Sequence, residues 1–307
     1  MTRTAPVRRT GPVSAPRPDP AAVPPPDQTS ASQPGPAPQT SASRPDPAAP
    51  ADRRRSMTAR AVLATAPGPG GRTVLATMRS APPITLRRTG PGQVYLVATA
   101  AGPLGGDDLA LDIDVAPGTA LDVRSVASTL VLPGPRPGSA PEESSMTITA
   151  RIGAGASLRF APEPTVLAAG CRHRMTVRLE LAPDARVLWR EEIVFGRYGE
   201  APGRCRTRFD AVVGGRPLLR QEFTVGDPAI DASPAVYGDA RCVGGTLITG
   251  PPGTAGSGSL LAGEAVIGDG WAVLPLAGPG VLVSALAPDA AGLRRRLERG
   301  ETAALPR

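Results

Sequence analysis

Apolar and polar residues alternate along most of the chain from residue 59 onward. A period of two is the signature of β-strands that bury one face and leave the other in water. Short alternating runs bounded by glycine and proline lie at 74–78, 93–98, 205–213, 218–225, 271–276 and 281–284. The pattern predicts a mainly β fold.

Three longer stretches share one form, which is strand, tight turn and strand. They span residues 111–123, 146–160 and 175–189, and each alternates apolar residues with Asp, Thr, Arg or Glu. Similar units that stack on one another bury a continuous core along the stack. We therefore expect a β-solenoid or β-helix-like stack of strands, with a β-sandwich as the alternative.

One helix is predicted at the C-terminal end. Asp289 has the character of an N-cap, Leu293 and Leu297 are spaced for one buried face, and Gly300 follows as a stop signal. The sequence thus predicts a short C-terminal helix that ends near Gly300.

The first 56 residues differ in composition from the rest. They contain no aromatic residue and are dominated by Pro, Ala, Ser, Thr and Arg. A segment with so little apolar surface to bury cannot offset the entropy of ordering it. We expect a disordered Pro/Ala-rich tail over residues 1–56 and a single β domain over 57–307.

The formal net charge of +7 comes largely from this tail. Residues 1–56 hold eight arginines and four aspartates, which leaves 26 arginines against 23 acidic residues in the domain. A domain so nearly balanced is not expected to bind nucleic acid. The chain has no lysine, which excludes Lys Schiff-base chemistry and any phosphate-binding loop that needs a lysine. The glycine-rich stretch 250–257 is therefore expected to be a flexible loop and not a nucleotide-binding loop.

Cysteine usage and hydropathy bear on the compartment. The three cysteines, Cys171, Cys205 and Cys242, are odd in number and widely spaced, which argues against a disulfide framework. No run approaches the 18 or so apolar residues that a membrane-spanning helix needs. We expect a cytoplasmic protein without membrane contact.

The candidate chemical groups are one histidine and several carboxylates. His173 is the only histidine, and it reads either as a structural residue or, with Cys171, as a transient metal ligand. Asp107 and Asp108 follow a glycine-rich turn, and Glu163 lies between two prolines. Most acids on strands are solvated, so the residues alone leave their roles open.

Glu191 and Glu192 form an adjacent pair in an alternating run. Neighbouring side chains of a strand point to opposite faces, so one of the two is expected to point inward. A buried acid is costly unless it is paired or binds a cation.

Six motifs occur in order along the domain: Gly102-Pro-Leu-Gly-Gly-Asp107-Asp-Leu109, Val115-Ala-Pro-Gly118, Arg124-Ser125-Val-Ala-Ser128-Thr129, Phe160-Ala-Pro-Glu163-Pro164, Trp189-Arg-Glu-Glu-Ile-Val-Phe-Gly-Arg197 and Gly215-Arg-Pro-Leu-Leu219. Together, over roughly residues 60–300, they resemble the urease accessory protein UreD (UreH) family. The resemblance implies a β-rich, non-enzymatic protein. Such a protein binds apo-urease and the accessory proteins UreF and UreG, and it passes Ni²⁺ to the urease active site without a permanently bound cofactor.

The resemblance also implies roles for individual residues. Asp107, Glu163 and Glu191 match polar positions associated with a transient nickel path, and the hydroxyl-bearing residues Ser125, Ser128 and Thr129 match its lining. Oxygen ligands suit this role because they hold a borderline divalent ion weakly enough to release it.

Two other functions remain open. One is a carboxylate-dependent hydrolase that uses Asp107 or Asp108 as its base with His173 assisting, which requires a pocket where these residues converge. The other is a plain β-rich adaptor with no metal passage.

Overall fold

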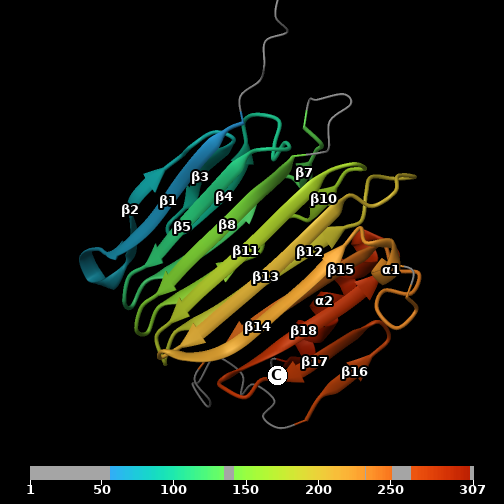
Figure 1. Ribbon diagram of the computed structural model, residues 1–307. Coiled ribbons are helices and arrows are strands. Elements are labelled where there is room, and N and C mark those ends of the chain that lie inside the picture. The colour runs from blue at the N-terminus through green and yellow to red at the C-terminus, as the bar shows by residue number, and fades with distance from the viewer. Residues whose placement is uncertain (1–55, 135–141, 232, 251–263, 305–307) are drawn as a thin grey trace, which may run out of the picture. The chain divides into compact units, whose positions relative to one another are not determined.

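The computed structural model describes residues 56–134, 142–231, 233–250 and 264–304. Two β-sheets face each other, and Figure 1 shows the smaller one in front. Its seven strands are, in spatial order, β14 (Arg216–Val225), β13 (Arg204–Val213), β11 (Arg172–Leu181), β8 (Glu143–Ile152), β5 (Asp108–Val115), β1 (Thr58–Pro67) and β2 (Thr73–Arg79). A short 3-10 turn (Pro69–Gly71) joins the last two.

The second sheet has eleven strands. Nine follow in the order β16 (Val266–Gly268), β17 (Trp271–Pro275), β18 (Gly280–Ala287), β15 (Cys242–Thr249), β12 (Arg186–Val194), β9 (Ser157–Phe160), β6 (Ala120–Ser125), β4 (Gln93–Ala98) and β3 (Ile84–Gly90). Two short strands lie off this path, because β10 (Thr165–Leu167) pairs with both β12 and β7 (Thr129–Val131).

The chain passes back and forth between the sheets from β5 to β13. Strands β5, β8, β11 and β13 pair in parallel in one sheet, and β6, β9 and β12 pair in parallel in the other. The three strand–turn–strand units supply β5–β6, β8–β9 and β11–β12. The mainly β prediction is confirmed.

The finer expectation of a β-solenoid is not confirmed. Antiparallel strands flank the parallel region in both sheets, as in the pairs β1–β2, β13–β14, β12–β15 and β3–β4. Regular winding is therefore limited to the middle of the body, and the architecture described is two large facing sheets.

The main core lies between the sheets. Inward residues of both sheets form one cluster, which the period-two pattern placed on a common face. Trp189 of β12 stacks on Phe160 of β9 at 4.0 Å between ring centroids, and it meets Phe209 of the opposite sheet edge-on at 6.2 Å. These aromatic contacts join the sheets near the middle of the body.

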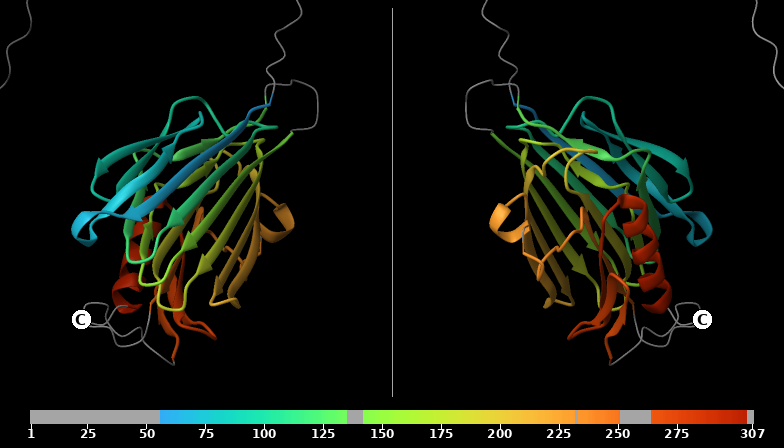
Figure 2. Two further views of the ribbon diagram at one scale, coloured as in Figure 1. Left: turned by 90° about the vertical axis from the view of Figure 1, so that its left-hand side faces the viewer. Right: turned by 90° about the vertical axis from the view of Figure 1, so that its right-hand side faces the viewer.

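Helix α2 (Ala290–Ala304) covers the outer face of the eleven-stranded sheet, as Figure 2 shows. The predicted cap is confirmed, because the amide of Gly292 donates to Asp289 Oδ1 at 2.7 Å. Leu293 and Leu297 are fully buried against β15 and β18. The predicted stop is wrong, because the helix continues through Gly300, which packs tightly on Val283 of β18.

A second, one-turn helix, α1 (Pro228–Asp231), was not expected from the sequence and contacts β14. The predicted disordered tail, apart from Ser56, and nearly all of the stretch 250–257 lie outside the described residues. Within the described part of the chain, no helix is long and apolar enough to cross a membrane.

Candidate functional site

A cavity of about 190 Å³ lies between the two sheets at the end where β8 and β11 begin. Five of the six residues that the resemblance assigns to a nickel path line it: Ser125, Ser128, Thr129, Glu163 and Glu191. The rest of the wall is mostly apolar. Ser128 and Thr129 are exposed, so the cavity opens to solvent beside β7.

Ser125 organises this opening. It ends β6, and its hydroxyl donates to the carbonyl of Ala127 at 2.9 Å. The same oxygen accepts the backbone amide of Glu163 at 2.8 Å. One hydroxyl thereby joins the loop after β6 to the loop after β9, and it holds Glu163 at the rim.

Glu191 lies deeper, on the inward face of β12. Its side chain is surrounded by protein but touches the cavity, and burial raises its pKa from 4.5 to about 7, an effect that the nearby Trp189 indole opposes. The Trp189 Nε1 itself makes no hydrogen bond in the described structure. A carboxyl with this pKa exchanges a proton near neutral pH.

Glu191 also lines a second cavity of about 30 Å³ on its other side. That space is large enough for one or two water molecules. Its wall includes Gln221, which is exposed on β14, the edge strand of the smaller sheet. Glu191 therefore stands between two cavities that reach different edges of the body.

Glu192, the neighbour of Glu191, points to the opposite face of β12, as the alternation predicted. Its Oε1 accepts from Arg294 Nε of α2 at 2.6 Å, while its Oε2 has no partner among the described residues. Burial raises the pKa of Glu192, and the Arg294 guanidinium opposes that shift.

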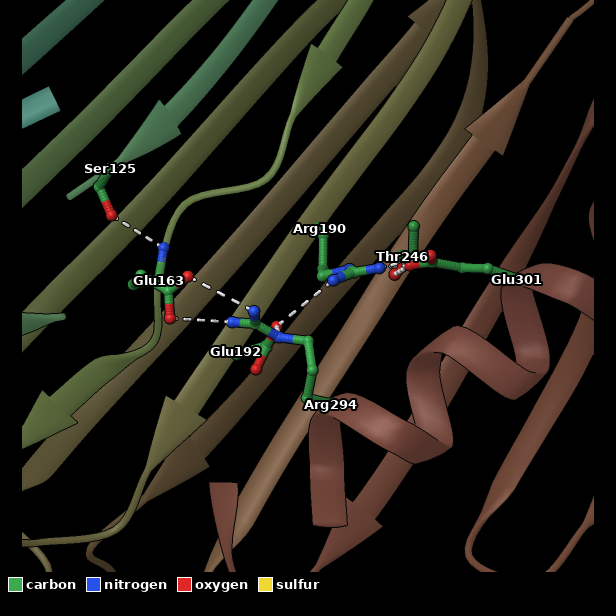
Figure 3. A network of polar contacts seen from close by, with 7 residues as sticks. All are labelled: Ser125, Glu163, Arg190, Glu192, Thr246, Arg294 and Glu301. Atoms are coloured by element: carbon green, nitrogen blue, oxygen red, sulfur yellow. Dashed lines mark hydrogen bonds and ion pairs between the residues drawn. The ribbon is translucent and has the colours of Figure 1, made fainter. Parts of the chain in front are cut away.

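Arg294 also reaches the cavity rim (Figure 3). Its two terminal nitrogens donate to the carboxylate of Glu163 at 3.2 and 3.4 Å. The guanidinium thus lies between two carboxylates, one fully buried and one 42% exposed. The sequence pattern showed Arg294 only as part of a basic helix, and nothing in it revealed this pairing with residues more than 100 positions away.

A second buried ion pair fastens the other end of α2. Arg190 of β12 binds the Glu301 carboxylate with two donors, one of them at 2.8 Å. The hydroxyl of Thr246 donates to the same carboxylate at 2.7 Å. Helix α2 is therefore attached to the sheet by arginine–glutamate pairs at both ends (Figure 3).

Asp107, the sixth predicted path residue, is placed behind the cavity wall. Its carboxylate accepts the backbone amides of Met57 at 3.0 Å and Leu104 at 2.8 Å, which fixes the turn and the start of β1. In the same turn, a side chain on Gly105 would collide with Gly134, since its Cβ would lie 2.7 Å from that backbone nitrogen. The turn is built for close packing of two loops.

The residues of the hydrolase alternative do not converge. Asp108 lies on the outer face of β5, where its carboxylate accepts from the Ser145 hydroxyl. His173 faces inward, with Nδ1 at 2.8 Å from Ser144 Oγ, and burial lowers its pKa to about 4. His173 lines the cavity, but neither aspartate is part of its wall.

The structure also gives little support to Cys171 and His173 as metal ligands. Both side chains are buried, and the three cysteines are free. Burial raises the pKa of Cys171 to about 11, so the thiol is protonated at neutral pH. Among the described residues, no three His, Cys, Asp or Glu side chains are grouped to hold a metal ion.

Comparison with known proteins agrees with the family resemblance of the sequence motifs. The family model described as UreD urease accessory protein matches residues 57–306. A protein of a Parafrankia species named urease accessory protein UreD is 44% identical over 274 residues, covering 81% of this chain and 89% of the relative. A Frankia casuarinae protein of the same name is 41% identical, covering 80% and 89%. In Streptomyces griseus, urease accessory protein UreD 3 is 41% identical, covering 79% and 95%.

Proposed function

Because this chain belongs to the UreD family of urease accessory proteins, we propose that it serves urease maturation as a scaffold and nickel conduit. In this role it binds apo-urease together with UreF and UreG in the cytoplasm. Ni²⁺ is its cargo and passes through the space between the two sheets.

One observation carries this proposal, which is the position of Glu191 between two cavities. An ion that enters beside Ser128 and Thr129 meets the Glu163 carboxylate at the rim and Glu191 further in. Beyond Glu191, the second cavity leads toward the exposed edge at Gln221. Carboxylates spaced along a mostly apolar passage supply the charge that a divalent cation needs once it loses water.

The chemistry of these groups suits transfer. Single carboxylates and hydroxyls bind a borderline ion such as Ni²⁺ more weakly than a site with several imidazole or thiolate ligands. Glu191 is half protonated near pH 7, so it gives up its proton when the ion arrives and takes one back when the ion leaves. Because Glu191 takes up a proton when the ion leaves, no unpaired charge remains buried.

A non-enzymatic role accords with the names of the relatives, which are all accessory proteins. The competing possibility is an adaptor that assembles the same partners but passes no metal. The two differ in whether changes inside the cavity affect nickel while leaving assembly intact.

The test uses a double variant, Glu163→Gln with Glu191→Gln, in a strain whose own gene is deleted. Deletion alone should leave urease present but poor in nickel and inactive. The double variant should restore binding to apo-urease, UreF and UreG but restore little of the nickel content, which is measured on purified urease. Asp107 is unsuitable here because its loss would disturb the backbone that it holds.

The matched control is Glu180→Gln with Glu222→Gln, which makes the same two side-chain replacements on the outer face of the seven-stranded sheet. It should restore full nickel content. Normal urease activity in the deletion strain would refute the whole proposal. Full nickel content with the cavity variant would instead establish the adaptor.

A further inference from the structure

An open groove of about 570 Å³ lies on the outer face of the seven-stranded sheet, beside α1. Four arginines line it, two from β11 (Arg172 and Arg174) and two from β13 (Arg204 and Arg206). The outer face of this sheet is not covered by α2, which packs on the other sheet (Figure 2). The groove is separate from the cavity described above, although the buried His173 borders both.

The four side chains form a regular array. Arg172 lies directly across from Arg204, and Arg174 directly across from Arg206, in the parallel register of β11 and β13. Neighbouring strands are about 4.8 Å apart, and alternate residues of one strand are about 6.7 Å apart. Like charges placed directly opposite each other destabilise a sheet, so this arrangement has a cost in stability.

Carboxylates of the protein neutralise only part of the array. Glu143 pairs with Arg174, and Asp227 pairs with Arg204 at 3.1 Å. Arg172 and Arg206 form no ion pair with any residue in the described ranges. The groove therefore carries two guanidinium groups that are free to bind an anion.

The stretches outside the described residues contain no cluster of acidic residues that could match the array. Residues 1–55 carry twice as many arginines as aspartates, and 135–141 and 251–263 contain no acidic residue. A segment with several closely spaced acids, as this array requires, is therefore expected from another molecule.

Tyr198 is an exposed aromatic residue that precedes β13 in the chain. Its side chain is fully exposed, on the loop that leads from β12 directly into Arg204 and β13. Arg241 donates to two carbonyls of the loop, those of Phe195 and Glu200, each at 2.6 Å, which holds it in place. An exposed aromatic side chain on a fixed loop is typical of an anchor in a protein interface.

We propose that this groove binds an extended acidic segment of a partner protein. In a β-like segment, carboxylates at alternate positions repeat every 6.7 Å or so, which matches the spacing of the arginines along β11 and β13. Tyr198 contacts the partner beside that segment. The inference goes beyond the proposed nickel role and depends on it only for the choice of natural partners in the second assay below.

The first assay uses the full chain and a labelled peptide about ten residues long in which glutamate alternates with threonine. Fluorescence anisotropy measures its affinity. The variant Arg172→Glu with Arg206→Glu should weaken binding about tenfold or more, since attraction becomes repulsion. The control, Arg87→Glu with Arg216→Glu, makes the same charge change at exposed positions outside the groove and should alter affinity less than about twofold.

Several results would overturn the proposal. One is equal weakening in both variants, and another is equal affinity for a peptide with glutamine in place of glutamate. Displacement of the peptide by inorganic phosphate at similar concentration would indicate a small-anion site. A dimer in sedimentation that the groove variant abolishes would make a second copy the occupant. If the charge-reversed variant does not fold, Arg172→Gln with Arg206→Gln takes its place and must weaken binding more than Arg87→Gln with Arg216→Gln.

The second assay measures binding of the full chain to apo-urease, UreF and UreG separately. The groove variant and Tyr198→Ala should each weaken binding to the same partner, and added salt should weaken it further. Unchanged binding to all three partners would overturn the proposal that the groove binds a partner, while leaving the proposed scaffold role intact. If the unaltered protein binds none of them but binds the acidic peptide, the scaffold role fails and the groove stands.

Discussion

At the scale of single residues, Glu191 is the acid whose pKa the fold changes most clearly among those that line the cavity. An isolated buried carboxylate is costly when charged, and the fold accommodates this one by letting it hold a proton up to about pH 7. Glu163 differs, because it is half exposed and is paired with Arg294. Two acids that line the same cavity thus have different electrostatic environments.

This difference leads to a pH-dependent prediction for Glu191→Gln. The pKa of the folded state lies near 7 and the ordinary value is 4.5, so rising pH ionises Glu191 in the unfolded chain first. The unaltered protein should therefore lose stability relative to the variant as pH rises from about 4.5 to 7, by at most about 3 kcal/mol. Denaturant unfolding at a series of pH values measures the difference.

Glu180→Gln is the control for that series, because Glu180 is exposed and paired with Arg151 on the outer face. It should show no comparable dependence over the same range. If the difference in unfolding free energy between Glu191→Gln and the unaltered protein does not change with pH, Glu191 is as well solvated as a surface acid.

At the scale of elements, helix α2 is the clearest case of a segment whose details depend on packing. Its cap and its buried leucines follow from local sequence, but its length does not. Gly300 was expected to end the helix because glycine commonly does so. Here the glycine lies inside the helix because β18 approaches so closely that a larger residue does not fit.

The two glycines of α2 should respond in opposite ways to alanine. A Cβ at Gly300 would lie 2.4 Å from Val283 Cγ1, whereas one at Gly292 would have no neighbour nearer than 3.4 Å. Gly292→Ala should stabilise the protein by up to about 1 kcal/mol through helix propensity. Gly300→Ala should destabilise it by about 1–3 kcal/mol despite the same gain in propensity.

Thermal and denaturant unfolding of the two variants measure these effects. Val283→Ala should restore part of the stability lost in Gly300→Ala, because it removes the group that the new methyl would strike. Stabilisation by Gly300→Ala alone would show that helix and sheet can separate at little cost.

At the scale of the whole molecule, all the described residues except Ser56 lie within the part that the family model matches, residues 57–306. Its N-terminal boundary is anchored, since the amide of Met57 donates to Asp107 and its carbonyl accepts from Asp108. Removing residues 1–55 leaves both contacts in place. The shortened chain should therefore unfold within about 2 °C of the full chain.

Calorimetry on both forms makes that comparison, and partner binding should be retained as well. A large drop in unfolding temperature would show that the first 55 residues pack on the body. Such a result would contradict the interpretation of that segment as a tail.

Local sequence determined most of the strands, the turns between them and the opposite orientations of Glu191 and Glu192. These follow from backbone alternation, which needs no knowledge of the rest of the chain. The motif order also pointed to the UreD family, and with it to five of the residues that line the cavity. Strand β15 was not predicted, because its residues are buried on both faces and do not alternate clearly.

The tertiary structure alone decided which of these groups meet. It joined Asp107 to Met57 behind the cavity wall, brought Arg294 between Glu163 and Glu192, and aligned four arginines of β11 and β13 in one groove. Each of these contacts joins residues far apart along the chain or depends on the register of two strands. Periodicity along one strand carries no information about the register of its neighbour, and so the sequence pattern could show the groups but not their partners.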